Sequence, residues 1–107
     1  MGLFDKFREL TVNEGLNRAR MEPNAVLLDV RTKEEFKKGH VSGAVNIPMD
    51  RLEQIKNRIR SADTTLYVVG DYNHQPRKAV KELKKLGYTH AVPSGVMEEH
   101  HAVSYSR

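Results

Sequence analysis

The side chains that could take part in binding or catalysis gather in a six-residue loop that follows an apolar run. The run from Thr65 to Val69 predicts a strand, and Pro76 suits the first position of the next helix. Ligands bind beyond the carboxyl ends of strands in parallel sheets, and free amides at a helix start attract anions. The negative charge of Asp71 opposes an anion there. The candidate ligand-binding residues are Gly70, Asp71, Tyr72, Asn73, His74 and Gln75.

Cysteine chemistry is excluded, because the chain contains no cysteine. Disulfides, thiolate metal sites, iron–sulfur clusters, cysteine nucleophiles and persulfide carriers all need a thiol. A chain without disulfides fits a reducing compartment, and we expect a cytoplasmic location.

Two histidines and two carboxylates in the stretch Glu98-Glu-His-His101 could act as metal ligands. Neighbouring side chains on a helix point about 100 degrees apart, and a structural zinc site needs four ligands in a closed tetrahedron. We therefore expect no metal and no other cofactor.

Length and composition favour one domain over residues 1–107, because 107 residues that are 38% hydrophobic can form one modest core. The net charge of +4 comes from lysines interleaved with acids in helical patterns. No zinc finger, RNA-stacking motif or arginine-rich block accompanies them, so we expect no nucleic-acid partner. The longest apolar run, residues 25–28, is far shorter than the roughly 20 residues of a membrane span.

The first ten residues form an amphipathic segment in which Leu3, Phe4, Phe7 and Leu10 have helix-like spacing. We interpret this segment as packed on the domain, with a membrane-surface anchor as the alternative. The polar tail at residues 96–107 is left without an assigned structure.

Capping boxes and apolar periodicity predict alternating strands and helices. A Ser, Thr or Asp followed three residues later by Glu marks three helix starts, at Thr11, Thr32 and Asp50. Short apolar or β-branched runs mark the strands. The predicted helices cover residues 11–21, 32–39, 50–59 and 76–86, and the predicted strands 25–30, 41–47, 65–69 and 90–92. This order is typical of an α/β sandwich with a mostly parallel sheet.

The stretch from Asp29 to Pro48 carries a dozen residues at fixed spacing: Asp-Val-Arg, Glu-Phe, Gly-His-Val-x-Gly-Ala-x-Asn-Ile-Pro. It closely resembles the rhodanese (sulfurtransferase) homology domain of the single-domain type, and the resemblance continues through Leu66-Tyr-Val-Val69 and Leu86-Gly-Tyr88. It implies a rhodanese-like three-layer sandwich, with about five mostly parallel strands flanked by helices.

The resemblance also implies a sulfur-transfer site that this chain does not complete. The family ends its central strand with a cysteine that carries sulfur as a persulfide, and its loop usually closes with an arginine. Counting back seventeen residues from Gly87 places the cysteine position at Gly70 and the arginine position at Gln75. Related phosphatases of this fold use a cysteine too, so their chemistry fails at the same residue.

The matched residues have structural explanations. We expect Glu35 to cap a helix, where it could pair with Arg31. We expect Asp29 to bond loop amides and His40 to bond within a turn. Glycine and proline shape the backbone. The family-motif residues are Asp29, Arg31, Glu35, His40, Gly43, Asn46 and Pro48.

We therefore predict a catalytically silent rhodanese-like domain, natural or engineered, that acts as a binding or regulatory module for a small anion or a protein partner. The alternative is a sulfurtransferase-class protein whose nucleophilic cysteine has been substituted by Gly70. A third hypothesis is an unrelated activity supported by Asp71, His74 and the loop amides.

Overall fold

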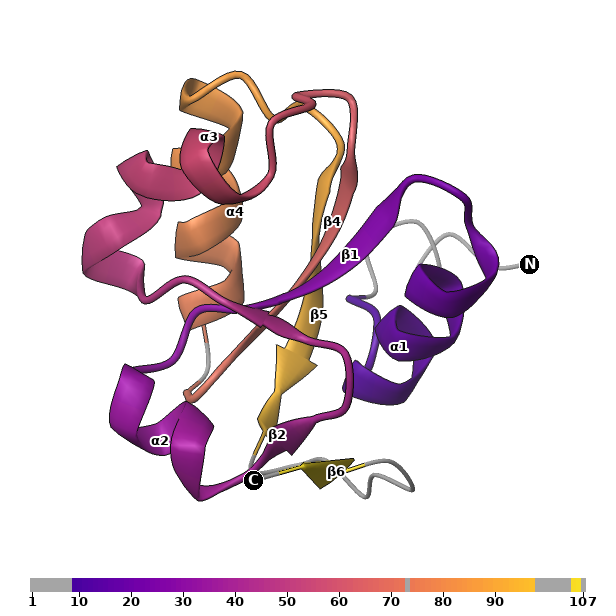
Figure 1. Ribbon diagram of the computed structural model, residues 1–107, viewed down its shortest axis with the longest axis vertical. Coiled ribbons are helices and arrows are strands. Elements are labelled where there is room, and N and C mark those ends of the chain that lie inside the picture. Colours follow the sequence, from indigo (N-terminus) through magenta and orange to yellow (C-terminus); the bar gives the residue numbers. More distant parts are fainter. Residues whose placement is uncertain (1–8, 73, 98–104, 107) are drawn as a thin grey trace.

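The structure, a computed structural model, describes residues 9–72, 74–97 and 105–106. Helices and strands alternate along most of the chain (Figure 1). The elements are α1 (Val12–Met21), β1 (Ala25–Asp29), α2 (Lys33–Lys38), β2 (His40–Val41), β3 (Val45–Asn46), the 3-10 helix η2 (Met49–Gln54), α3 (Ile55–Arg58), β4 (Thr65–Gly70), α4 (Gln75–Lys85), β5 (Ala91–Val96) and β6 (Tyr105–Ser106).

The main sheet has four parallel strands in the order β3-β1-β4-β5. The expected α/β sandwich with a mostly parallel sheet is confirmed, with four strands in this sheet among the described residues where about five were expected. The segment predicted as one strand over residues 41–47 is two strands, because Gly43 forms a turn with φ of +88° and Ala44 donates to the Val41 carbonyl at 3.0 Å. The first of them, β2, pairs antiparallel with β6 in a separate small sheet.

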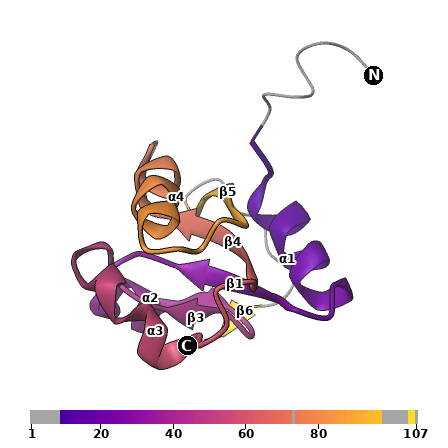
Figure 2. The same cartoon turned by 90° about the horizontal axis from the view of Figure 1, so that it is seen from above.

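Helices cover both faces of the main sheet, with α1 on one side and α4, η2 and α3 on the other (Figure 2). Successive residues of a strand point to opposite faces. Leu27 and Tyr67 pack with α1, whereas Leu28 and Val68 pack in the larger core beneath α4 and η2. Burial on both faces explains why β1 and β4 are continuous apolar runs.

Two predicted capping boxes, Thr11 with Glu14 and Thr32 with Glu35, are confirmed. The predicted cap at Asp50 is wrong. Helix η2 begins at Met49, directly after Pro48, and has no side-chain cap. The fixed φ of proline suits the residue before this start, which leaves Asp50 inside the first turn.

Helix α4 begins at Gln75, one residue before the predicted start, and ends in a Schellman motif at Gly87. The Tyr88 amide donates to the Leu83 carbonyl at 2.9 Å, and Gly87 has the positive φ of +101° that this motif requires. Tyr88 itself is fully buried, and its hydroxyl donates to the Ile59 carbonyl.

Strand β5 runs through Val96, beyond the predicted end at Val92. Pro93 lies within this strand although proline cannot donate to a sheet ladder. It is tolerated because, among the described strands of this sheet, β5 lies at the edge and pairs with β4 alone.

Within the part of the chain that the structure describes, no helix is long and apolar enough to cross a membrane. The predicted amphipathic segment lies almost wholly outside the described residues, as does the stretch Glu98–His101. The cytoplasmic location stays a prediction.

Charge introduced into the larger core should destroy cooperative folding. Leu28 and Val68 are both 0% exposed, and an aspartate at either position would bury an unpaired charge. We expect Leu28→Asp and Val68→Asp to lose the single melting transition followed by circular dichroism. The matched control is Met21→Asp at a side chain that is 83% exposed, and it should keep the transition. A cooperative melt in either core variant would contradict this assignment of the core.

Helix α1 approaches the sheet closely at Gly15. A Cβ at this position would lie 2.8 Å from both the Cβ and the Oγ of Ser94. Alanine normally stabilises a helix interior relative to glycine, but overpacking costs about 1–3 kcal/mol. We expect Gly15→Ala to lower the free energy of unfolding, as measured by urea denaturation. Ser94→Ala should not lower it, because the buried Ser94 hydroxyl has no hydrogen-bond partner among the described residues. The reverse order of stabilities would disprove this packing.

Candidate functional site

The loop after β4 is closed by the side chain of Gln75. This side chain is buried, and its Oε1 accepts a hydrogen bond from the Asp71 amide at 2.6 Å. A Cβ placed on Gly70 would lie 2.7 Å from that oxygen and 3.0 Å from the Cδ of Pro76. Gln75 therefore fills the space that a side chain at position 70 would enter, and it engages a loop amide that an anion would need.

The other described loop residues, Tyr72 and His74, are exposed, and His74 lines a small cavity beside the loop. Tyr72 is 48% exposed, and the Lys78 ammonium lies 5.9 Å from the centre of its ring. His74 is exposed and has a φ of +74°, a conformation that non-glycine residues rarely adopt. Asn73 lies outside the described residues. The structure thus brings Gly70, Asp71 and Gln75 together and leaves Tyr72 and His74 apart from them.

A contact between two carboxyl groups connects this loop to α2. A side-chain hydrogen bond with Asp71 is the main cause that lowers the pKa of Glu35, while burial acts in the opposite direction. Bonds from the hydroxyl and amide of Thr32 and the charge of Arg31 lower the same pKa further. Glu35 and Asp71 therefore connect the start of α2 to the loop after β4.

The buried ion pair at the end of β1 joins Asp29 to Arg31. The charge of Arg31 also acts on Glu35 and lowers the pKa of that carboxyl. Asp29 is 0% exposed and Arg31 is 6% exposed. The guanidinium donates through Nε and NH2 to both carboxylate oxygens at 2.9–3.1 Å, and the Arg31 amide donates to the same carboxylate at 3.0 Å. The expected bond from a loop amide to Asp29 is therefore present.

The remaining family-motif residues bond to the backbone around this pair. The Asn46 amide donates to the carbonyls of Asp29 and Arg31 at 2.9 and 3.0 Å. His40 lies 2.8 Å through Nδ1 from the Phe36 carbonyl, and its ring stacks on that of Phe36 with centroids 3.7 Å apart. These contacts support the interpretation that the motif shapes the fold, and none of them points into the loop.

A small cavity of about 310 Å³ lies beside the loop, between the segment before α1, the start of α4 and the end of β5. The cations and carboxylates on its walls are Arg77 and Glu9, which form an ion pair with each other. This pairing leaves the guanidinium of Arg77 engaged, so the cavity has no free cation for an anionic ligand among the charged groups that line it.

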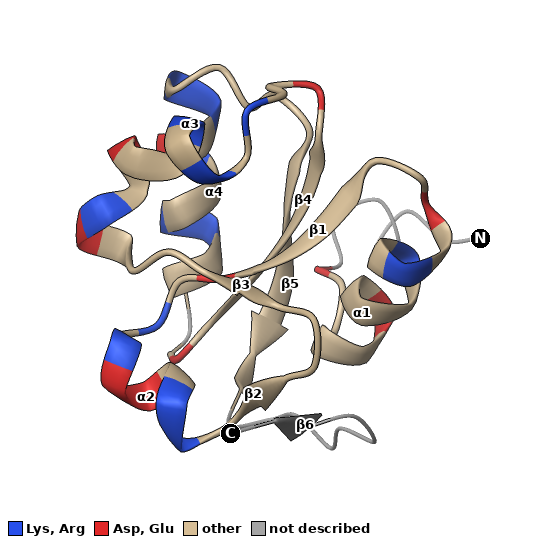
Figure 3. Ribbon diagram, in the orientation of Figure 1, with Lys and Arg blue, Asp and Glu red and all other residues tan. Residues whose placement is uncertain are grey.

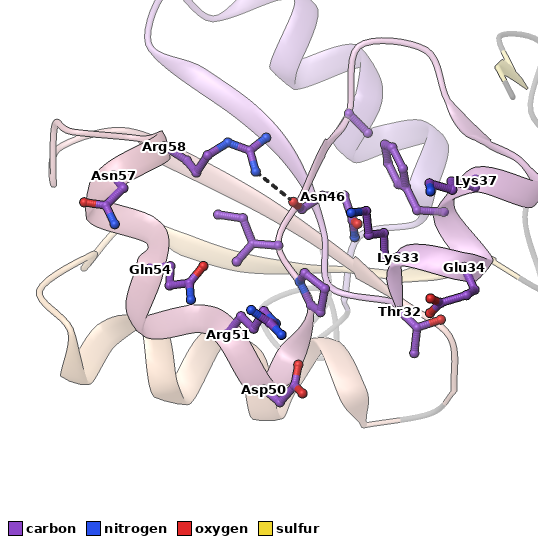
Figure 4. A pocket seen from close by; sticks show the side chains of 14 residues that line it. Thr32, Lys33, Glu34, Lys37, Asn46, Asp50, Arg51, Gln54, Asn57 and Arg58 are labelled. Carbon is purple, nitrogen blue, oxygen red and sulfur yellow. Dashed lines mark hydrogen bonds between the residues drawn. The ribbon is translucent and has the colours of Figure 1, made fainter.

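A larger cavity of about 820 Å³ lies elsewhere, between α2, β3 and the helices η2 and α3 (Figure 4). Its basic residues are Lys33, Lys37, Arg51 and Arg58. The sequence pattern indicates a solvated helix face for the lysines of α2 and assigns no role to the arginines. The spacing could have indicated two basic helix faces, since Lys33 and Lys37 are one helical turn apart and Arg51 and Arg58 are two.

The parallel sheet, its helices and the loop after β4 define a rhodanese-like α/β domain whose cysteine position holds glycine. The profile of the rhodanese-like domain family matches residues 12–94, which is more than half of the chain. The chain therefore belongs to the rhodanese family, and the resemblance found in the motif from Asp29 to Pro48 is confirmed.

Several relatives share this sequence pattern. The uncharacterized protein YqhL of Bacillus subtilis is 42% identical over 65 residues, which cover 61% of this chain and 51% of that protein. The thiosulfate sulfurtransferase PspE of Escherichia coli is 34% identical over 76 residues, which cover 67% of this chain and 70% of that protein. The chain thus spans about half the length of the first relative.

Solved structures agree with the fold. A rhodanese with anions from E. coli superposes with a TM-score of 0.69 at 27% identity, covering 78% of this chain and 98% of that one. A single-domain sulfurtransferase of Saccharomyces cerevisiae gives a TM-score of 0.70 at 17% identity, covering 86% of each chain, which shows the fold alone.

Removing one partner of the buried ion pair should lower the free energy of unfolding more than removing both partners. Arg31→Met would leave the Asp29 carboxylate buried without its cation, a change that costs about 3–5 kcal/mol in buried pairs. We expect the double variant Asp29→Asn, Arg31→Met to unfold at a higher urea concentration than Arg31→Met alone. If the double variant were less stable than Arg31→Met, the unpaired charge of the buried Asp29 carboxylate would not be the cause of the destabilisation.

Proposed function

We propose that this chain is a rhodanese-like domain that transfers no sulfur and acts as a binding or regulatory module. Sulfur transfer in this family depends on a cysteine at the end of the central strand, where this chain has Gly70. The observation that carries the proposal is the position of the Gln75 side chain, which fills the space next to Gly70 and bonds the Asp71 amide.

Substitution of the nucleophile alone would leave an empty loop able to hold an anion. Here the residue at the usual arginine position is neutral, and its carboxamide oxygen takes the place of an external acceptor. The Asp71 amide is partly buried, and a hydrogen bond of this kind is worth about 0.5–1.5 kcal/mol. A ligand entering the loop would have to displace Gln75, which supports a partner that binds elsewhere on the domain.

The alternative is a protein of the sulfurtransferase class whose cysteine has been substituted without other change to the loop. The similarity to the E. coli thiosulfate sulfurtransferase favours it. It predicts that a cysteine at position 70 restores activity once the crowding by Gln75 is relieved, whereas our proposal predicts that it does not.

Thiosulfate:cyanide sulfurtransferase assays separate the two. We expect no thiocyanate above the buffer blank from the wild-type chain, from Gln75→Ala or from the double variant Gly70→Cys, Gln75→Ala. In the double variant the Pro76 Cδ still lies 3.0 Å from the Cβ position of residue 70, and no arginine closes the loop. The E. coli enzyme serves as the positive control.

The assay is informative only for folded variants that carry a reactive thiol. A single melting transition and a stoichiometric thiol titration of the double variant establish both. Thiocyanate formation by the wild-type chain would disprove the proposal outright. Turnover by the double variant alone would establish the substituted sulfurtransferase instead.

A further inference from the structure

The cavity of about 820 Å³ is a groove with two helical walls and a strand for its floor (Figure 4). Lys33 and Lys37 stand on α2, and Arg51 and Arg58 stand on η2 and α3 across from them. The floor is formed by residues of β3 and the turn that follows it, at the edge of the main sheet. None of the described loop residues between Gly70 and Gln75 lines this groove.

Positive charge dominates the groove. Its lining contains four basic side chains and two acidic ones, Glu34 and Asp50. Figure 3 shows the basic positions of α2 and of the helices opposite. Lys33, Lys37 and Arg51 are exposed and make no ion pair or hydrogen bond with the residues that the structure describes. An acidic ligand would therefore meet cations that no internal carboxylate neutralises.

The groove also has apolar surface, and the backbone of its floor offers little opportunity for hydrogen bonds to a ligand. Phe36, Ala44 and Pro48 line the groove and are each partly exposed. The Asn46 carbonyl at the open edge already accepts a hydrogen bond from the Arg58 guanidinium at 3.3 Å. Cations beside an edge strand also prevent unwanted strand pairing, which accounts for Arg58. It does not account for Lys33, Lys37 and Arg51, because none of them bonds to the strand.

We propose that the groove between α2 and the helices η2 and α3 docks an acidic segment of a partner protein. Carboxylates of that segment face the two basic walls, and apolar side chains between them contact Phe36 and Pro48. The inference rests on the proposed function, since it names the partner of a module that transfers no sulfur.

The acidic rim of the groove favours a peptide over a nucleic acid. Glu34 and Asp50 repel a ligand that presents a phosphate at every repeat, whereas a peptide can place neutral residues opposite them. Apolar contacts on the floor likewise suit side chains better than a sugar–phosphate backbone. Single-stranded RNA is therefore the discriminating competitor.

The test uses a fluorescein-labelled peptide of twelve residues in which glutamate alternates with leucine. We expect the wild-type chain to raise its anisotropy at low salt, and the same peptide with glutamine for glutamate to bind at least tenfold more weakly. Exposed ion pairs contribute about 0.2–1 kcal/mol each, so several must act together. Binding should weaken as ionic strength rises, because salt screens exposed charges.

A charge-reversal pair locates the site. Lys37→Glu with Arg51→Glu places one reversal on each wall, and neither side chain makes a hydrogen bond or ion pair with the described residues that the substitution would remove. Lys81→Glu with Lys84→Glu on α4 is the matched control, because both changes lie on exposed residues outside the groove. Each pair changes the formal charge by four units, from +4 to 0. We expect the groove pair to weaken peptide binding at least tenfold and the control pair to change it less than threefold.

Three results would overturn the inference: no binding of the acidic peptide, equal weakening by both variant pairs, or tighter binding of oligo(U) RNA than of the peptide with the same dependence on the groove.

Amide shifts in a nitrogen–proton correlation spectrum add a direct readout, with changes expected at Asn46 and Gln54 and not at Gly70. Failure of peptide binding leaves the sulfurtransferase assay unaffected, so the two proposals fail separately.

Discussion

The buried ion pair of Asp29 and Arg31 is the interaction on which the surrounding structure depends. Arg31 donates to the Asp29 carboxylate and, at 2.8 Å, to the Gly39 carbonyl after α2. Asn46 of β3 donates to the carbonyls of both residues. One desolvated charge pair therefore ties the end of β1 to α2 and to β3. A pair so deeply buried is stable only when its remaining donors and acceptors are satisfied, and these backbone bonds do that.

The same pair positions both regions that bear on function. Glu35, which contacts Asp71 in the loop, and Lys33 and Lys37, which line the groove, all stand on α2. The floor of the groove is β3, which Asn46 holds beside β1. The residues of the family motif thus hold α2 and β3 in place beside β1, and none of these contacts involves position 70.

Loop and groove differ in what they offer a ligand. In the loop, Gln75 occupies the space next to Gly70 and uses the Asp71 amide internally. In the groove, Lys33, Lys37 and Arg51 have no partner among the described residues, and apolar side chains line the same groove. A filled loop beside an open groove agrees with the proposal that the domain acts as a binding module.

Local interactions were readable from the sequence because they join residues three positions apart. The capping boxes at Thr11 and Thr32 and the apolar runs of β1 and β4 needed no tertiary information. Tertiary packing decided that Asp29 and Arg31 are buried together as an ion pair, with Asn46 bonded to the backbone of both. It also decided that Gln75 turns back onto Gly70, and that two separate basic helices face each other across β3. These features depend on distances between elements, which no periodicity within one element can specify.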